Sequence, residues 1–491
     1  EGLDTNLEGV KSWGYHGYWA SNLEKLDSHL GTEEEFSALL DEAHKRGMKI
    51  MVDVVLNHTG YEASTKEYYN TYIKDENGNP VHMLREEDEM VSGSDQKTSL
   101  AGLPDFLTEN KEVRELLVEW QSNWISKYPI DYYRVDTVKH VDDTTWSAFK
   151  NALTKINPKF KMIGEWAGAG YSTDTGMLGT GRMDSLLDFD FNDQARAFAN
   201  GKIRDVESFL QGRNAALNNT ATLGQFMSSH DEDGLLYKLV NADNISEERA
   251  KELFKVAASL QLTAKGQPVI YYGEEVGQYG ADNYPYQTNR YDFDWSIANA
   301  DNEMYVHYKK LLEIRNQFTE VFAKGSRTAI ATSDEEKYDV FTRNYGDEKL
   351  YVCLNTAQNE KTIEINTAEA KDTVLYDLYS EKYYVADDNG NVNVNIPEAS
   401  KGGTAILVKT DADNKELSIK AIPSQTYTGK AIVLDENSLV VKYNYKDKYG
   451  RNKCERKYLL CQLQIQYGKI QRRKKGIYRL YHKPECDRKH T

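Results

Sequence analysis

The sequence has little cysteine, and what it has is unevenly placed. Of four cysteines among 491 residues, only Cys353 lies away from the C-terminal region that holds Cys454, Cys461 and Cys486. The body of the chain therefore has no disulfide framework. There is also no run of about 18 apolar residues, which excludes a membrane-spanning helix. The residues that follow Glu1 do not form a charged segment and then an apolar one, which is the pattern of a signal peptide. We therefore expect that a signal peptide has been removed or is not part of this sequence.

Positive charge is in deficit. The chain has 61 Lys and Arg against 77 Asp and Glu, a formal net charge of −16, which argues against nucleic acid as a partner. No phosphate-binding glycine loop and no Cys/His metal cluster is found. The deficit is uneven, because residues 441–491 carry 16 Lys and Arg against 4 Asp and Glu. This basic tail differs in composition from the rest of the chain.

What is present is enough apolar sequence for a large core. The chain is 40% hydrophobic, and its length favours two to four domains. Its 34 tyrosines and 7 tryptophans suit a protein that stacks rings on sugars, although tyrosine is also common in cores.

Between Thr32 and about Asn316, amphipathic helical patterns alternate with short β-branched runs, which is typical of βα units around a parallel sheet. In the first unit, Thr32 and Glu35 form a capping box and Arg46-Gly47 ends the helix. Further helices are expected at 111–127 and 143–155. The six expected strands lie near 50–55, 130–136, 160–165, 185–190, 222–229 and 267–272.

The pattern divides the chain into segments. We expect a partial (β/α)₈ barrel at 1–59, an inserted small domain at 60–105, and the barrel continued over 106–322. Alternating strands then predict a C-terminal antiparallel β-sandwich at 323–410. Residues 411–440 are expected to begin another β-domain, and beyond Lys442 no strand or helix period persists. The predicted fold class is α/β.

Polar clusters stand at the ends of four predicted strands. In IDYYRVDTVKH, alternation places Arg134 and Asp136 on one face. The pair could be a structural ion pair, but an inward arginine that keeps a carboxylate ionised by lowering its pKa also suits a nucleophile.

The other clusters add a second carboxylate and a histidine pair. Glu165 ends an apolar strand beside Trp166, a setting that raises a carboxyl pKa as a general acid requires. His230-Asp231 follows a later strand, and Asn57-His58 follows the first. Two carboxylates at one sheet edge meet the requirement of a glycosidase.

These residues resemble the α-amylase family, glycoside hydrolase family 13. Its four ordered motifs are matched by DVVLNH at 53–58, YRVDTVKH at 133–140, GEW at 164–166 and MSSHD at 227–231, and GLPDF and YHGYW are similar to further family motifs. The resemblance covers roughly residues 10–409.

The resemblance implies a retaining hydrolysis of internal α-1,4 bonds in starch and malto-oligosaccharides. Asp136 would attack the anomeric carbon, Glu165 would be the acid and base, and Asp231 would stabilise the distorted sugar. Arg134 would orient Asp136. The implied sugar-binding residues are Tyr18, His58, His230, Lys139 and His140.

The resemblance also implies a structural Ca²⁺ between the barrel and the inserted domain. Its implied ligands are Asn57, Asp105 and the backbone carbonyl of His140, all oxygen donors that suit calcium. A further acidic ligand is expected from the insertion, but MVSGSDQKTSLAG does not indicate which residue.

The chain departs from the family at both ends. The first two barrel strands and the first helix are expected to be missing, which would leave open sheet edges and could inactivate the chain. Circular permutation is the rival explanation. The stretch AIPSQTYTGKAI resembles the start of bacterial surface immunoglobulin-like repeats, and the tail after it resembles out-of-frame translation, with a wall-binding segment as the alternative.

We therefore expect a monomeric, extracellular bacterial α-amylase. Two other functions stay open: an α-glucanotransferase, or a starch-binding remnant without activity.

Overall fold

The computed structural model describes residues 3–5, 11–217, 222–284, 286–410, 415–419, 441–446 and 452–457. Two compact units are present, Glu1–Thr410 and Asp411–Thr491. None of the helices among the described residues is both long and apolar enough to cross a membrane.

The centre of the first unit is a six-stranded parallel sheet whose strands follow one another in chain order. Each strand pairs in register with the next, for example Asp53 with Arg134 and Arg134 with Ile163. All six lie at the positions predicted from the sequence. They are β3 (Met51–Val54), β4 (Tyr132–Val135), β5 (Lys161–Gly164), β6 (Ser185–Asp188), β7 (Thr222–Gln225) and β8 (Gln267–Pro268).

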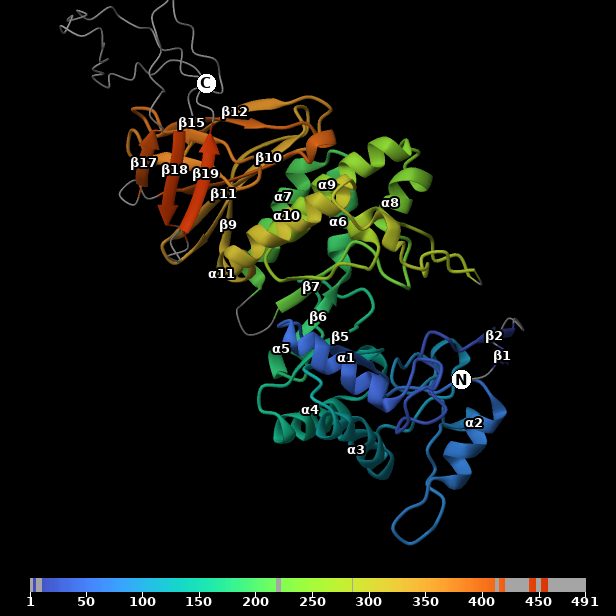
Figure 1. Cartoon of the computed structure of the whole chain (residues 1–491). Helices are drawn as coiled ribbons and strands as arrows, with labels where there is room; N and C mark the ends of the chain where they lie inside the picture. The colour runs from blue at the N-terminus through green and yellow to red at the C-terminus, as the bar shows by residue number, and fades with distance from the viewer. Residues whose placement is uncertain are drawn as a thin grey trace, which may run out of the picture. The chain divides into compact units, whose positions relative to one another are not determined.

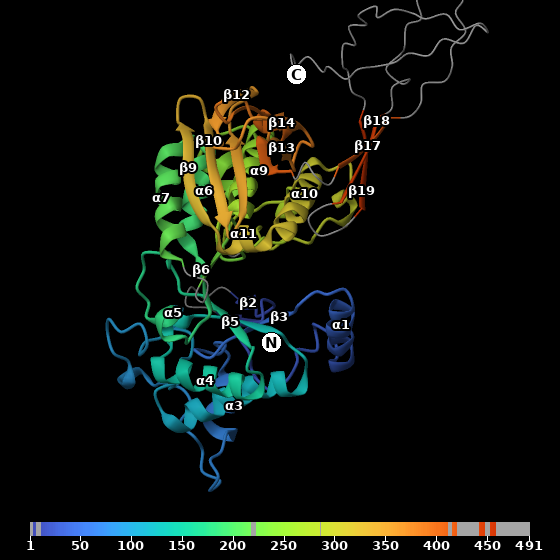
Figure 2. The same cartoon turned by 90° about the vertical axis from the view of Figure 1, so that its left-hand side faces the viewer.

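Helices fill the connections between these strands, as a βα pattern requires. The predicted capping box of the first helix is present, with Thr32 accepting from the backbone N–H of Glu35 and Glu35 from that of Thr32. Helices α3 and α4 lie side by side in both views (Figures 1 and 2). The helices are α1 (Glu33–Lys45), α3 (Lys111–Lys127), α4 (Asp143–Ile156), α5 (Met177–Thr180), α6 (Phe189–Ala199), α7 (Ile203–Ala216), α8 (Leu235–Tyr237), α9 (Glu247–Thr263), α10 (Glu303–Gln317) and α11 (Thr319–Lys324).

The sheet does not close among the described strands. Its order runs from β3 to β8, and these two edge strands do not pair with each other in the described part of the chain. A short antiparallel pair, β1 (Leu3–Thr5) and β2 (Lys11–Trp13), forms a separate sheet. The described residues thus contain six of the parallel strands expected of a barrel, and these six strands form an open sheet.

The segment between β3 and α3 holds short helices and its own small core. Helix α2 (Ala63–Glu67) is followed by a π-helical turn at Tyr68–Tyr72 and by 3₁₀ turns at Glu87–Glu89 and Leu100–Gly102. Tyr69, Met83 and Phe106 are buried together with residues of α3. This packing fixes the segment against the start of α3.

The C-terminal part of the first unit is an antiparallel sandwich. A six-stranded sheet of order β14-β13-β16-β11-β10-β9 buries one face against the two-stranded sheet β12-β15 and the other against α9 and α10. Strand β11 is hydrophobic from Leu350 to Leu354 for this reason, with Cys353 facing β12-β15 and Val352 facing the helices. The strands are β9 (Ser326–Ser333), β10 (Tyr338–Tyr345), β11 (Glu348–Asn355), β12 (Lys361–Asn366), β13 (Val374–Asp377), β14 (Tyr383–Val385), β15 (Asn391–Ile396) and β16 (Thr404–Lys409).

The second unit contains a three-stranded antiparallel sheet of β17 (Lys415–Ile419), β18 (Val441–Lys446) and β19 (Asn452–Lys457). The expectation that no strand occurs beyond Lys442 was wrong. The sequence VKYNYK alternates Val and Tyr with polar residues, which is the period of a strand. Most of the expected repeat at 411–440 and of the tail at 441–491 lies outside the described residues.

Candidate active site

Three acidic side chains meet at the carboxyl ends of the first three parallel strands. The ladder continues past the strands, because Asp136 donates its N–H to the carbonyl of Val54 and Glu165 donates to that of Val135. This backbone pairing places residues of neighbouring strands next to each other. The carboxyl groups concerned are those of Asp53, Asp136 and Glu165.

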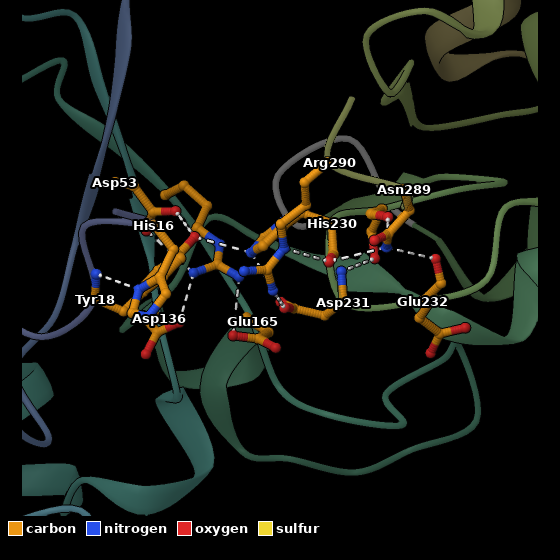
Figure 3. Close-up of polar contacts among 12 residues, drawn as sticks. His16, Tyr18, Asp53, Asp136, Glu165, His230, Asp231, Glu232, Asn289 and Arg290 are labelled. Atoms are coloured by element: carbon orange, nitrogen blue, oxygen red, sulfur yellow. Dashed lines mark hydrogen bonds and ion pairs between the residues drawn. The ribbon is translucent and has the colours of Figure 1, made fainter. Parts of the chain in front are cut away.

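Arg134 joins these carboxyl groups. Its Nη1 lies 2.7 Å from Oδ1 of Asp136 and 3.1 Å from Oδ1 of Asp53, while Nη2 lies 2.9 Å from Oε2 of Glu165 (Figure 3). The arginine side chain is only 13% exposed. One buried cation therefore balances three carboxyl groups, and the predicted Arg134–Asp136 pair is part of a larger cluster.

Burial raises the pKa of Asp136, and Arg134 opposes that rise. The sequence predicted a lowered pKa from the arginine alone, which was wrong because burial is the larger effect. Burial likewise raises the pKa of Glu165. The neighbouring Asp136 carboxyl raises the pKa of Glu165 further, and the two interacting groups titrate as a pair.

The chain turns sharply after Asp136. Thr137 has a φ of 49°, a left-handed conformation that a β-branched residue rarely adopts. Its N–H points to Oε2 of Glu165 at 3.3 Å. Gly164 permits close packing below, since a Cβ there would lie 2.8 Å from Cγ2 of Val138.

The turn after β7 brings in the histidine and aspartate predicted from MSSHD. Nε2 of His230 lies 2.8 Å from Oδ2 of Asp231, and Nη2 of Arg290 donates to Oδ1 of Asp231 at 3.0 Å. Burial by itself would raise the pKa of Asp231, but His230 and Arg290 outweigh it and the pKa is lowered. Asp231 is thus an ionised carboxylate.

Tyr18 connects the two sides of the site. Its hydroxyl donates to Oδ2 of Asp53 at 2.6 Å and lies 3.1 Å from Nε2 of His230. The Tyr18 and His230 rings are stacked, 5.5 Å apart and within 1° of parallel. Since β3 and β7 are four strands apart in the sheet, this contact shows that the sheet curls until its strand ends face one another.

The remaining predicted sugar-binding residues lie on two sides. His58 is buried, and burial lowers its pKa to about 4, so its ring is neutral. Lys139 and His140 are tied to the insertion instead, because Nζ of Lys139 lies 3.2 Å from Oδ2 of Asp95 and Nδ1 of His140 donates to the carbonyl of Asp95 at 2.8 Å.

The three predicted calcium ligands are also brought together. The Asn57 side-chain oxygen faces Oδ1 of Asp105 at 3.2 Å and the carbonyl of His140 at 3.0 Å, unless the amide is rotated so that its nitrogen donates to both. The other oxygen of Asp105 accepts from Nε of Arg85 at 2.7 Å. Among the described residues, no three His, Cys, Asp or Glu side chains are grouped to hold a metal ion.

Sequence reasoning missed four residues of the site: Glu274, Asn289, Arg290, and His16, whose Nδ1 accepts from the backbone N–H of Tyr18 at 3.1 Å. Asn289 and Arg290 belong to a loop that returns to the His230–Asp231 turn from about 60 positions away. Glu274 is buried and accepts from the hydroxyl of Ser228 at 2.5 Å. GEE stands after a predicted strand like the other clusters and could have been noticed, whereas nothing in QTNRY marks a contact.

Comparison with known proteins decides the family. The sequence model described as "Alpha amylase, catalytic domain" matches residues 8–389. The chain belongs to the α-amylase family. The motif-based prediction of an α-amylase-type glycosidase is confirmed at this level.

Two curated relatives to which the chain is similar share about a quarter of its residues over the matched length. It is 25% identical over 397 residues to α-amylase 1 of Schwanniomyces occidentalis, covering 78% of this chain and 74% of that protein. It is 27% identical over 372 residues to neopullulanase 2 of Thermoactinomyces vulgaris, covering 72% of this chain and 60% of that protein.

A solved structure supports an α-amylase-type fold with a C-terminal sheet domain. The Anoxybacillus α-amylase matches with a TM-score of 0.67 at 25% identity, covering 83% of this chain and 85% of that one. The cluster around Arg134 and the turn that carries Asp231 are both built from residues of this chain.

Proposed function

We propose that this protein hydrolyses internal α-1,4-glucosidic bonds of starch and related α-glucans with retention of configuration. The observation that carries the proposal is the cluster in which the guanidinium of Arg134 contacts the carboxyls of both Asp136, at 2.7 Å, and Glu165, at 2.9 Å. Retaining glycosidases need carboxyls about 5 Å apart, whereas inverting enzymes need about 6.5–9.5 Å to admit a water. Two carboxyls that contact the two terminal nitrogens of one guanidinium fit the shorter spacing.

Each carboxyl has its own role in this reaction. Asp136, whose Oδ1 lies 2.7 Å from Nη1 of Arg134, attacks the anomeric carbon and forms the covalent glycosyl ester. Glu165 donates its proton to the departing glycosidic oxygen. In the second step Glu165 takes a proton from water, and that water displaces Asp136 from the sugar. Asp231, ionised by His230 and Arg290, stabilises the positive charge that develops on the ring.

The neighbouring side chains are proposed to bind the sugar. Tyr18 offers a ring beside the carboxylates, and His58 and His230 would bind hydroxyls of the sugar at the cleavage point. Lys139 and His140, on the side of the insertion, would contact the sugar of the leaving group.

We also propose that Asn57, Asp105 and the His140 carbonyl bind Ca²⁺, which would hold the insertion to the sheet. Oxygens 3.0 and 3.2 Å apart have the spacing of neighbours in a shell with bonds of about 2.3–2.6 Å. An Asn57 oxygen that faces only other oxygens lacks a donor, and a cation would satisfy it.

The proposed setting is extracellular and the proposed state is monomeric. We further infer that the six parallel strands belong to a barrel of the TIM type, since Tyr18 links the ends of β3 and β7 across the site.

The test is the release of reducing ends from soluble starch by the full chain, compared with Asp136→Asn and Glu165→Gln. Both variants should lose at least about 10³-fold in kcat, which matches the size of a lost nucleophile or acid. Asp131→Asn is the matched control, because Asp131 directly precedes β4, at the end opposite to Asp136, and pairs with Lys49. It should keep its activity within about twofold.

Product analysis separates the alternatives. Proton NMR of the first products should show the α-anomer. Longer products in the presence of added maltose would identify a transferase. Starch binding without turnover, in the wild type and both variants, would contradict an enzyme and leave a binding protein.

A further inference from the structure

We propose that Asn289 is a positioning residue that fixes the His230–Asp231 turn and so holds the Asp231 carboxylate in place. The inference rests on the proposed function, in which Asp231 stabilises the transition state.

The turn presents its backbone carbonyls to one buried amide. Nδ2 of Asn289 lies 3.2 Å from the carbonyl of Ser229, 3.0 Å from that of His230 and 3.1 Å from that of Glu232 (Figure 3). The Asn289 side chain is 2% exposed. Carbonyls that converge in this way repel one another and need a shared donor, and a primary amide supplies two N–H groups at a single point.

Asn289 is itself fixed from behind. Its backbone N–H donates to Ala281 and its carbonyl accepts from the hydroxyl of Tyr271 at 2.9 Å. Its side-chain oxygen makes no hydrogen bond to any described residue. Among the described residues, the hydrogen bonds of the Asn289 side chain therefore come from its amide nitrogen and go to carbonyls of the turn.

The next residue fixes the carboxylate. Arg290 donates from Nε to the carbonyl of His230 at 3.0 Å and from Nη2 to Oδ1 of Asp231 at 3.0 Å. Two consecutive residues of one loop thus contact different parts of the turn. Asn289 holds its backbone, and Arg290 holds the carboxylate of Asp231. Asp231 needs both, since its own side chain is half exposed.

A second buried contact supports the same turn from below. Ser228 donates to Glu274 and accepts from the N–H of Leu235 at 3.2 Å. Ser228, Ser229, Glu274 and Asn289 line one small cavity behind the turn. The backbone before and after Asp231 is therefore anchored, and the amide of Asn289 is the only side-chain donor, among the described residues, to the carbonyls of both Ser229 and Glu232.

The test is a double-mutant cycle between Asn289→Ala and Asp231→Asn on an aryl α-maltoside, whose leaving group keeps the residual rates measurable. Because a small misplacement of a reacting group can cost on the order of 10²-fold, Asn289→Ala should lower kcat about 10- to 100-fold while KM changes less than about threefold. In the Asp231→Asn background the same change should cost less than about threefold, since the residue that it positions is already gone. Asn289→Ser, which keeps one donor, should be intermediate.

Asn302→Ala is the matched control. Asn302 also donates its amide to a loop carbonyl, that of Val276 at 2.9 Å, and it caps α10, so its loss weakens the fold without touching the turn. Equal losses in both backgrounds, or a kcat loss from Asn302→Ala as large as from Asn289→Ala, would show a merely structural role.

A readout without turnover separates this proposal from the proposed function. Hydrogen exchange of the peptide that spans 226–235 should become faster in Asn289→Ala and stay unchanged in Asn302→Ala. Unchanged exchange in Asn289→Ala overturns the positioning role. Absent starch hydrolysis with faster exchange overturns the proposed function alone.

Discussion

The hydroxyl of Tyr18 lies 3.1 Å from Nε2 of His230, and their rings are stacked within 1° of parallel. The same hydroxyl donates to Asp53, so one phenol connects the end of β3 with the turn after β7. The contact joins two strand ends that lie four strands apart in the sheet.

Replacing Tyr18 by Phe keeps the stacked ring and removes the connecting hydroxyl. We expect kcat/KM on maltoheptaose to fall about 10- to 100-fold, because a hydrogen bond to a charged group contributes about 1.5–3 kcal/mol. Steady-state kinetics measure the loss. Tyr72→Phe, at an exposed tyrosine of the insertion, is the control. A Tyr18→Phe enzyme as active as the wild type would show that the hydroxyl has no part in the site.

Arg134→Gln should move the whole pH profile toward alkaline values. Arg134 lowers the pKa of both Asp136 and Glu165, so its loss raises both. Asp136 must be ionised and Glu165 protonated, which means that the acid limb and the basic limb of kcat/KM both shift upward. The profile is measured from about pH 4 to 9 in constant ionic strength. A limb that stays in place or moves toward acid would contradict the cluster described here.

Calcium should stabilise the fold if the oxygens of Asn57, Asp105 and His140 bind it. At a concentration of about 100 times Kd, binding adds about 2.7 kcal/mol, which corresponds to a rise in Tm of several degrees over EDTA. Scanning calorimetry measures the rise, and Asp105→Asn should abolish it. Equal Tm values in calcium and EDTA would mean that the rotated Asn57 amide already satisfies these oxygens.

Glu274 should make the protein sensitive to alkali. Burial raises the pKa of Glu274 from 4.5 to about 8, although Ser228 opposes the rise. A carboxyl whose pKa is raised by folding stabilises fully below its unfolded pKa, and that contribution is lost as the pH rises through about 8. Between pH 7 and 9 the wild type should therefore lose about 1 kcal/mol more than Glu274→Gln in urea unfolding.

The quantity to compare between wild type and Glu274→Gln is the slope of the free energy of unfolding against pH. The absolute stability is not compared, because the amide also disturbs the contact with the N–H of Tyr271. Glu76→Gln, on an exposed turn, should keep the slope of the wild type. Equal slopes in wild type and Glu274→Gln would show that Glu274 is ionised at neutral pH.

The sequence predicted the elements whose causes are local. Helix α3 spans the predicted residues 111–127, because its apolar periodicity and its N-cap at Asn110 depend only on residues that are close in sequence. The strand ends likewise placed Arg134, Asp136 and Glu165 together, since neighbouring parallel strands carry their ends to one edge.

The contacts that cross the sheet could not be predicted in this way. The contact of Tyr18 with His230 spans 212 positions and depends on how far the sheet curls. The return of Asn289 depends on the path of a long loop. The pKa of Asp136 was predicted in the wrong direction, because a strand pattern shows the neighbouring charge but not the depth of burial.

The two edges of the parallel sheet have different consequences for how the protein behaves at high concentration. In the described part of the chain, β8 is two residues long and ends in Pro268, which has no N–H to offer another strand. The β3 edge has four residues, and Met51 is 48% exposed. We expect association between molecules to begin at β3, so dilute storage and a lysine at position 51 should slow the loss of soluble protein.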